Sequence, residues 1–153
     1  MPLVPDQLLI RDVKPNDFEK LYDIDRICFP DYMAYSRAEL RFYLRHPFSI
    51  SRLAEFARNV IGFAIGRIEP GACAHIITLD VVPGERRRKV GSALMEVLHA
   101  EFRRLGAARV MLEVDTGNET AQSFYLGLGY ERRELLRGYY DARSDAYRMM
   151  LIL

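Results

Sequence analysis

Residues 79–95 read Leu-Asp-Val-Val-Pro-Gly-Glu-Arg-Arg-Arg-Lys-Val-Gly-Ser-Ala-Leu-Met, a strand-like apolar stretch that passes through a basic turn into a helical pattern. The first N–H groups of a helix have no intrahelical partner, and the helix dipole is positive there. Gly91 would let the backbone approach a phosphate closely, and the arginines would add charge-assisted hydrogen bonds. The segment therefore predicts an anion site, and the alternative is a solvated basic turn that happens to precede a helix. No aromatic residue interleaves with the arginines, so a nucleic-acid patch is the poorer interpretation.

Apolar spacing on both sides of this segment predicts an ordered series of strands and helices. Strands are expected over residues 8–13, 50–56, 60–68, 75–82, 108–114, 130–136 and 146–153, and helices over 16–28, from Ser36 onward, over 89–105 and over 120–128. Ser36 followed by Glu39 is typical of a capping box, and a polar loop is expected over 137–145. The order predicts one mixed α/β (α+β) domain over residues 1–153, with parallel pairing in the middle of the chain and antiparallel pairing on its flanks.

The composition is that of an ordinary globular protein. The chain has 153 residues, half of them apolar, and a formal net charge of +1, so no global field favours nucleic acid or an anionic membrane. Its two cysteines, Cys28 and Cys73, are too few for the disulfide framework of a small secreted protein, and we expect both to be reduced and buried. We find no signal-peptide pattern and no apolar run long enough to span a bilayer. The expectation is a soluble cytoplasmic protein with no metal and no membrane or nucleic-acid partner.

The basic turn also carries a family resemblance. Arg86-Arg87-Arg88-Lys89-Val90-Gly91 resembles the acetyl-CoA signature of the GNAT superfamily of N-acetyltransferases, Arg/Gln-x-x-Gly-x-Gly/Ala. Lys89 stands at the first glycine position, where it leaves the backbone N–H available but requires an ordinary φ. A second register, Arg88-x-x-Gly91-x-Ala93, fits the pattern literally, and we prefer the first because it keeps Leu94-Met95 in their usual place.

This resemblance implies a fold, a co-substrate and a set of contacts. The fold would be the GNAT fold, a central, mostly antiparallel sheet of about seven strands flanked by about four helices, and the co-substrate would be acetyl-CoA. The preceding strand would offer backbone groups to the pantetheine arm and the thioester carbonyl from Leu79, Asp80 and Val81. The residues implied at the phosphates are Arg86, Arg87, Arg88, Lys89, Val90, Gly91 and Ser92.

A second motif narrows the resemblance to a subgroup. The pattern Leu112-Glu113-Val114-x-x-x-Asn118-x-x-Ala121-x-x-x-Tyr125-x-x-Leu128-Gly129-Tyr130 resembles that of bacterial ribosomal-protein N-terminal acetyltransferases and their archaeal and eukaryotic relatives. Cys28-Phe29-Pro30 with Tyr35-Ser36, the pair Tyr139-Tyr140 and the final stretch 145–149 resemble the same subgroup, so the resemblance covers nearly the whole chain. Outside this context, a lone Glu in a strand is usually solvated or salt-bridged, and a lone Tyr on a helix usually packs in the core.

The subgroup implies direct transfer in a ternary complex, without an acyl-enzyme. Glu113 would be the general base through a water molecule. Tyr125 would protonate or hydrogen-bond the departing thiolate, and Asn118 would bind pantetheine or hold its loop. An α-amino group has a pKa of about 8 and a lysine side chain one of about 10.4, so an N-terminal amine needs only a weak base. The implied walls of a peptide channel, which could instead simply pack the domain edge, are Phe29, Tyr32, Tyr35, Tyr139 and Tyr140.

Several alternatives remain open at this point. The same cofactor motif would serve an enzyme that acetylates a small amine, an amino sugar or a lysine side chain, and the loops 31–35 and 137–145 would discriminate among them. A non-catalytic acyl-CoA-binding module would keep the basic turn but would not need Glu113 and Tyr125. The acceptor is therefore expected to be a protein N-terminus, such as that of a ribosomal protein, or a small amine. The last strand could be an exposed edge that favours a homodimer, or part of the core of a monomer.

Overall fold

A computed structural model describes residues 7–153, and these form one seven-stranded sheet in the order β1-β2-β3-β4-β5-β7-β6. The strands are β1 (Leu9–Asp12), β2 (Ser49–Phe56), β3 (Asn59–Glu69), β4 (Cys73–Val81), β5 (Arg109–Asp115), β6 (Glu131–Asp141) and β7 (Ser144–Ile152). The helices are α1 (Phe18–Cys28), α2 (Arg37–Arg45), α3 (Val90–Arg104) and α4 (Glu119–Gly127), with short 3-10 helices η1 (Pro15–Asp17) and η2 (Pro83–Arg88). Only the pair β4–β5 is parallel among these strands. The predicted mixed, mostly antiparallel fold is confirmed.

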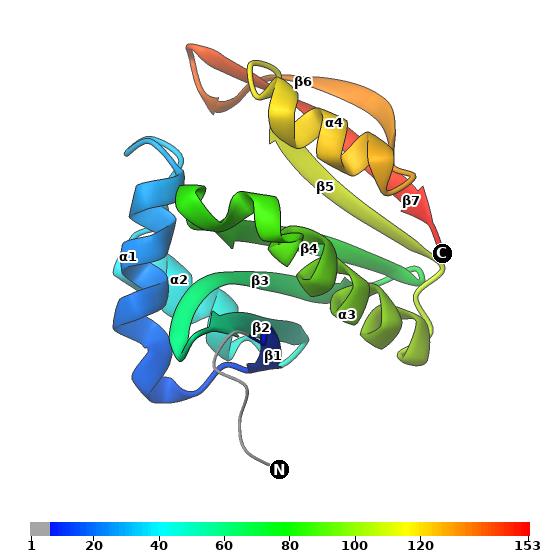
Figure 1. The fold of residues 1–153 in the computed structure, drawn as a ribbon. Coiled ribbons are helices and arrows are strands. Elements are labelled where there is room, and N and C mark those ends of the chain that lie inside the picture. The colour runs from blue at the N-terminus through cyan, green and yellow to red at the C-terminus, as the bar shows by residue number, and fades with distance from the viewer. Residues whose placement is uncertain (1–6) are drawn as a thin grey trace.

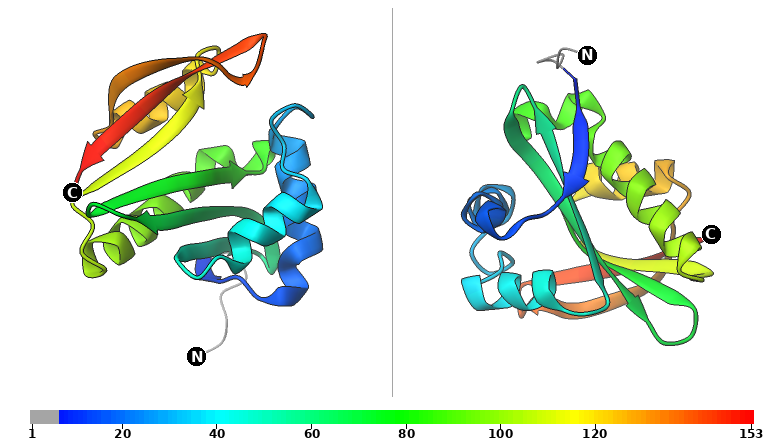
Figure 2. Two further views of the ribbon diagram at one scale, coloured as in Figure 1. Left: turned by 180° about the vertical axis from the view of Figure 1, so that it is seen from behind. Right: turned by 90° about the horizontal axis from the view of Figure 1, so that it is seen from below.

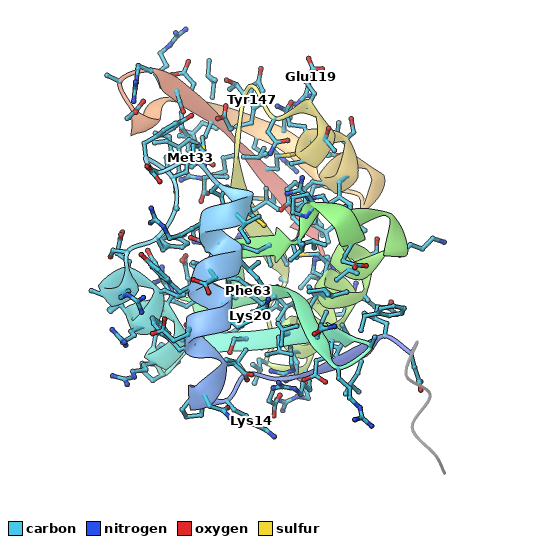
Figure 3. The ribbon with its side chains drawn as sticks, turned by 60° about the vertical axis from the view of Figure 1, so that its left-hand side comes forward. Lys14, Lys20, Met33, Phe63, Glu119 and Tyr147 are labelled. Carbon is cyan, nitrogen blue, oxygen red and sulfur yellow. The ribbon has the colours of Figure 1, made fainter. Side chains whose placement is uncertain are left out.

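Helices cover both faces of the sheet, with α1 and α2 on one face and α3 on the other (Figure 2). Leu21 and Ile24 of α1 pack with Leu40 of α2 against Phe63 and Ile65 of β3. Figure 3 shows Phe63 behind α1. The opposite face buries Leu94, Met95, Leu98 and Phe102 of α3 together with Val110, Leu112 and Val114 of β5. Because alternate residues of a strand point to opposite faces, Glu113 is directed away from this second core.

Local sequence signals explain where α2 begins. The Ser36 hydroxyl accepts the Glu39 N–H at 3.1 Å, and the Glu39 carboxylate accepts the Ser36 N–H at 3.0 Å. Both bonds of the predicted capping box are therefore present, and they satisfy two N–H groups that the helix itself cannot. Within residues 7–153, no helix is long and apolar enough to cross a membrane.

The parallel strands β4 and β5 separate along their length (Figure 1). They pair with each other only where Cys73–His75 meets Arg109–Met111. Beyond that point β4 pairs only with β3, and β5 pairs only with β7. A bulge also lies in β4, because Ile65 of β3 opposes Thr78 while Gly66 opposes Ile76. Ile77 is thus an extra residue, and a bulge of this kind bends its strand.

One expectation about the last strands is wrong, and one of two open alternatives is excluded. Residues 137–141 belong to β6 rather than to a loop, because four residues, 137–140, bulge opposite Asp145 alone and the hairpin then resumes with Asp141 opposite Ser144. The bulge is held by the Gly138 N–H, which donates to Asp145 Oδ1 at 2.8 Å, and Gly138 has φ 61°. β7 is also not an edge strand, since it pairs with β5 on one side and β6 on the other.

Candidate active site

A cleft of about 630 Å³ occupies the opening between β4 and β5. It is lined at one end by the start of α3 and at the other by the loop after α1. Of the residues that the sequence predicts, the structure brings together Phe29, Tyr32, Tyr35, Leu79, Val81, Arg86, Lys89, Gly91, Ser92, Glu113, Asn118, Tyr125 and Tyr140 along this cleft.

Three predicted residues whose side chains the structure describes, Asp80, Val90 and Tyr139, do not line the cleft walls in this way. Asp80 and Val90 are fully buried, so their side chains belong to the interior. Tyr139 is half-exposed and contributes its hydroxyl from outside the cleft. The side chains of Arg87 and Arg88 lie outside the described residues. Within the part of the chain that the structure describes, no group of three or more His, Cys, Asp and Glu is placed to hold a metal ion.

The start of α3 has the properties of an anion site. Its N-cap, Lys89, makes no side-chain cap, and the first intrahelical bond runs from Ala93 N to Lys89 O at 3.1 Å. The preceding N–H groups, including those of Gly91 and Ser92, are therefore not satisfied by the helix. A Cβ on Gly91 would lie 3.2 Å from Phe124 Cζ, so this position also needs a small residue for α3 and α4 to approach each other.

Lys89 differs from its prediction. Its backbone has φ 59° and ψ 28°, in the left-handed region, although we expected an ordinary φ. The turn from η2 into α3 demands this conformation, and a lysine adopts it where glycine would do so without steric cost. Lys89 thus keeps the left-handed backbone geometry that a glycine would adopt at the first glycine position of the signature.

The end of β4 presents backbone groups to the cleft. Val82 N donates across to Ile61 O of β3 at 2.9 Å. Because successive N–H groups of a strand point to opposite edges, that of Val81 faces the side where β5 has separated. The Val81 carbonyl accepts the Arg86 Nε–H at 3.1 Å and the Cys28 thiol at 3.3 Å. Arg86 is therefore fixed against the strand that precedes it.

Tyr125 is available as a proton donor in the middle of the cleft. Only 9% of the residue is exposed, and burial, with a contribution from Asp80, raises the pKa of its hydroxyl well above 10. The phenol therefore stays protonated at neutral pH, and it makes no hydrogen bond to another described residue. Asn118 caps α4 by accepting the Ala121 N–H at 3.1 Å, which fixes the loop beside Tyr125.

Glu113 lies within a network of four side chains. Its Oε1 is 2.6 Å from His75 Nε2 and accepts the Tyr139 hydroxyl at 3.1 Å, while its Oε2 accepts Arg148 Nε at 3.1 Å. Burial acts to raise the pKa of Glu113, but the hydrogen bonds and charges of His75 and Arg148 outweigh it and lower the pKa. The carboxylate is therefore ionised and only weakly basic.

His75 is the main residue that sequence reasoning missed. Burial tends to lower the pKa of its imidazole, but Glu113 on one side and Glu69 on the other raise it. The only signal in the sequence was that His75 is a polar residue on β4, the strand that pairs with the strand of Glu113. Its side chain faces the same side of the sheet as Glu113. That signal becomes visible once His75 is known to lie opposite Met111, two residues from Glu113.

Aromatic side chains enclose the other end of the cleft. The Tyr35 hydroxyl donates to Ile77 O at 3.1 Å, and Tyr35 N donates to Asp25 Oδ2 at 2.7 Å, so this ring is held against the β4 bulge. The Arg143 guanidinium lies 5.6 Å from the centre of the Tyr32 ring and joins the tip of the β6–β7 hairpin to the loop after α1. Figure 3 shows Met33 in this loop, beyond the end of α1.

The family model of the acetyltransferase (GNAT) family matches residues 18–130, which span both the basic turn and the Glu113–Tyr125 motif. The chain belongs to the GNAT family. It is therefore an acyltransferase, and acetyl-CoA is the acetyl donor expected from the signature and confirmed by the family.

Three similar proteins extend this result over nearly the whole chain. An uncharacterized N-acetyltransferase of Methanocaldococcus jannaschii is 30% identical over 144 residues, which cover 94% of this chain and 90% of that one. The crystal structure of Ard1 from Thermoplasma volcanium has a TM-score of 0.89 at 31% identity, covering 95% and 97% of the two chains. The ribosomal-protein-S18-alanine N-acetyltransferase of Escherichia coli has a TM-score of 0.86 at 25% identity, covering 95% and 94%.

Proposed function

We propose that this GNAT enzyme acetylates the N-terminal α-amino group of a protein, by direct transfer from acetyl-CoA in a ternary complex. The observation that carries the proposal is the position of Glu113, an ionised and weakly basic carboxylate beside the aromatic end of the cleft. Such a base suits an α-amine, with a pKa of about 8, better than a lysine amine at about 10.4. The relationship to an S18-alanine N-acetyltransferase supports the same acceptor class.

The carboxylates of the cleft argue against a polycationic small molecule. Asp25 accepts Tyr35 N, Asp115 accepts Gly117 N at 2.8 Å, and Glu113 is paired with His75 and Arg148. Glu113 is thus paired with cations, Asp115 uses one oxygen for a backbone N–H, and Asp25 is only 1% exposed, although its Oδ1 has no hydrogen-bond partner among the described residues. An aminoglycoside or polyamine would need free acidic groups to replace the hydration of its several ammonium ions.

Each part of the cleft would then have its own role in the reaction. The uncapped start of α3, with Arg86 and Lys89, would hold the phosphates, and the Val81 N–H would polarise the thioester carbonyl. Glu113 would take the proton of the amine through a water molecule. Tyr125 would give its proton to the thiolate, and solvent would restore it. Phe29, Tyr32, Tyr35 and Tyr140 would wall the peptide, with Tyr139 at its rim.

An acceptor panel tests the proposal. The purified protein is incubated with acetyl-CoA and with free-amine peptides that begin with Ala, Ser, Met or Gly, their N-blocked lysine-containing versions, polyamines and aminoglycosides, and thiol release is followed. We expect acetylation of the free-amine peptides, with turnover reduced about 100-fold in Glu113→Gln and clearly reduced in Tyr125→Phe. Activity restricted to blocked lysine peptides or small amines would refute the N-terminal acceptor, and near-wild-type turnover in both variants would refute the roles.

A further inference from the structure

Two carboxyl groups lie against each other beside the cleft, where α1 packs on β4. Asp25 of α1 is 1% exposed, and Asp80 of β4 is fully buried. The two side chains are hydrogen-bonded to each other, which requires a proton on one of them because an ionised carboxylate only accepts. No other donor among the described residues reaches Asp25 Oδ1 or Asp80 Oδ2. A single proton between the two groups would therefore satisfy both of these buried oxygens.

The other two oxygens connect the pair to β4 and to the loop that follows α1. Asp25 Oδ2 accepts the Tyr35 N–H at 2.7 Å, and Asp80 Oδ1 accepts the Thr78 hydroxyl. The Tyr35 hydroxyl returns to β4, where it donates to Ile77 O at 3.1 Å. A series of hydrogen bonds thus runs from β4 through the carboxyl pair to the loop that lines the aromatic end of the cleft.

The surroundings of the pair favour a retained proton. Burial, the hydrogen bond with Asp25 and the charge of Asp25 raise the pKa of Asp80 well above the ordinary value of about 4, whereas Thr78 and the Arg86 guanidinium of η2 lower it by less. Burial also raises the pKa of each titratable neighbour, so these groups stay uncharged at neutral pH. They come from α1, from the loop after it and from α4, and are Cys28, Tyr35 and Tyr125.

We propose that Asp25 and Asp80 share one proton at neutral pH and thereby act as positioning residues, which hold the loop after α1 where it binds the acceptor. This inference rests on the proposed function in that this loop is assigned to the acceptor. With the proton present, Asp25 keeps one oxygen for Asp80 and the other for the Tyr35 N–H. Without it, two adjacent anions would repel each other, and Asp25 could turn away from Asp80 only by releasing the Tyr35 N–H.

The kinetic test compares Asp80→Asn with Asp80→Ala. The amide of D80N can accept the Thr78 hydroxyl and donate an N–H to Asp25, so the KM for the acceptor should stay near the wild-type value. D80A removes the donor, and the acceptor KM should rise about tenfold, as when one hydrogen bond to a charged group is lost, with kcat and the KM for acetyl-CoA little changed. Asp17→Ala is the matched control, because Asp17 is also buried and bonded to Arg11, but lies outside the cleft.

Two NMR measurements need no acceptor, and they keep this inference separate from the proposed function. Carbon-13 shifts of the aspartate carboxyls should show one proton held by the pair at pH 7, where Asp17, whose pKa is lowered by Arg11, is fully ionised. That proton should be absent from D80N. Deuterium exchange of the Tyr35 N–H should be equally slow in the wild type, D80N and D17A, and faster in D80A.

A retained proton, together with faster Tyr35 exchange and a higher acceptor KM in D80A, supports the inference. If both carboxyls are ionised at pH 7, or if D80N raises the acceptor KM as much as D80A does, proton sharing is wrong. An acceptor KM that is unchanged in D80A, or raised equally in D17A, would overturn the positioning role. If D80A does not fold, the proton count and the kinetics of D80N decide. The assays use whichever amine the panel shows to be acetylated, so an acceptor other than a protein N-terminus leaves this test intact.

Discussion

Lys89 provides a prediction whose magnitude follows from its backbone, which has φ 59° and ψ 28° at the entry to α3. A residue with a Cβ loses about 1–2 kcal/mol in the left-handed region relative to the right-handed one. Glycine avoids that loss but gives up about 0.5–1 kcal/mol more conformational entropy on folding. The difference predicts that Lys89→Gly is more stable than Lys89→Ala by about 1 kcal/mol, or roughly 2–4 °C in Tm for a chain of this size.

The two variants form a matched pair, because both remove the ammonium group and only one retains a Cβ. Thermal unfolding followed by circular dichroism measures the difference in Tm, and calorimetric titration with acetyl-CoA measures binding. If the ammonium contacts a phosphate, both variants should bind acetyl-CoA more weakly to the same extent, and the loss should shrink as salt is added. Equal Tm values for the glycine and alanine variants would refute the left-handed assignment and the reasoning built on it.

Three further predictions concern the core and the buried titratable groups. In Gly66→Ala the new Cβ would overlap Cζ of the fully buried Phe102 and lie 2.9 Å from its Cε1; urea unfolding should show a loss of about 1–3 kcal/mol, whereas Gly127→Ala, which meets nothing within 4 Å, should not be destabilised. Burial raises the pKa of Cys28 to about 11, so iodoacetamide at pH 8 should alkylate it far more slowly than in the unfolded chain, as judged by mass spectrometry. Burial, aided by the charge of Arg103, lowers the pKa of His99 to about 4. The pKa of His99 in the unfolded chain is about 6.5, so the folded state is favoured by the neutral imidazole. This contribution to the free energy of unfolding is complete above pH 6.5 and is lost as the pH falls toward 4. His99→Gln should therefore flatten the plot of stability against pH between these values, and an unchanged plot would contradict the assignment.

Sequence reasoning predicted most of the secondary structure because each element carries a local signal. The start of α2 was visible in Ser36 and Glu39, and the helical and alternating periods located the remaining helices and strands. The hairpin end of β6 was missed because the polar, glycine-containing stretch 137–145 has the composition of a loop. Its bulge depends on Asp145, which holds the Gly138 N–H and whose own carbonyl accepts Thr116 N at 3.0 Å.

The motifs carry enough chemistry to identify a cofactor turn and two candidate catalytic residues. Val81, Gly91 and Tyr125 lie along one cleft, and their roles there remain those that we propose. The resemblance could not show the ionisation of Glu113, because that depends on His75 and Arg148, which are 38 and 35 residues away in the chain.

The sequence by itself determined the family, the order of the elements and the basic turn that we propose holds the acetyl donor, since these depend on short-range spacing of residue types. Only the tertiary structure decided that β4 and β5 separate after three paired residues, that Lys89 accepts a left-handed conformation, and that His75 stands between Glu113 and Glu69. Each of these outcomes depends on register and packing between distant segments. Such contacts leave no periodic trace in the sequence, because the free energy that selects them arises only when the strands are assembled.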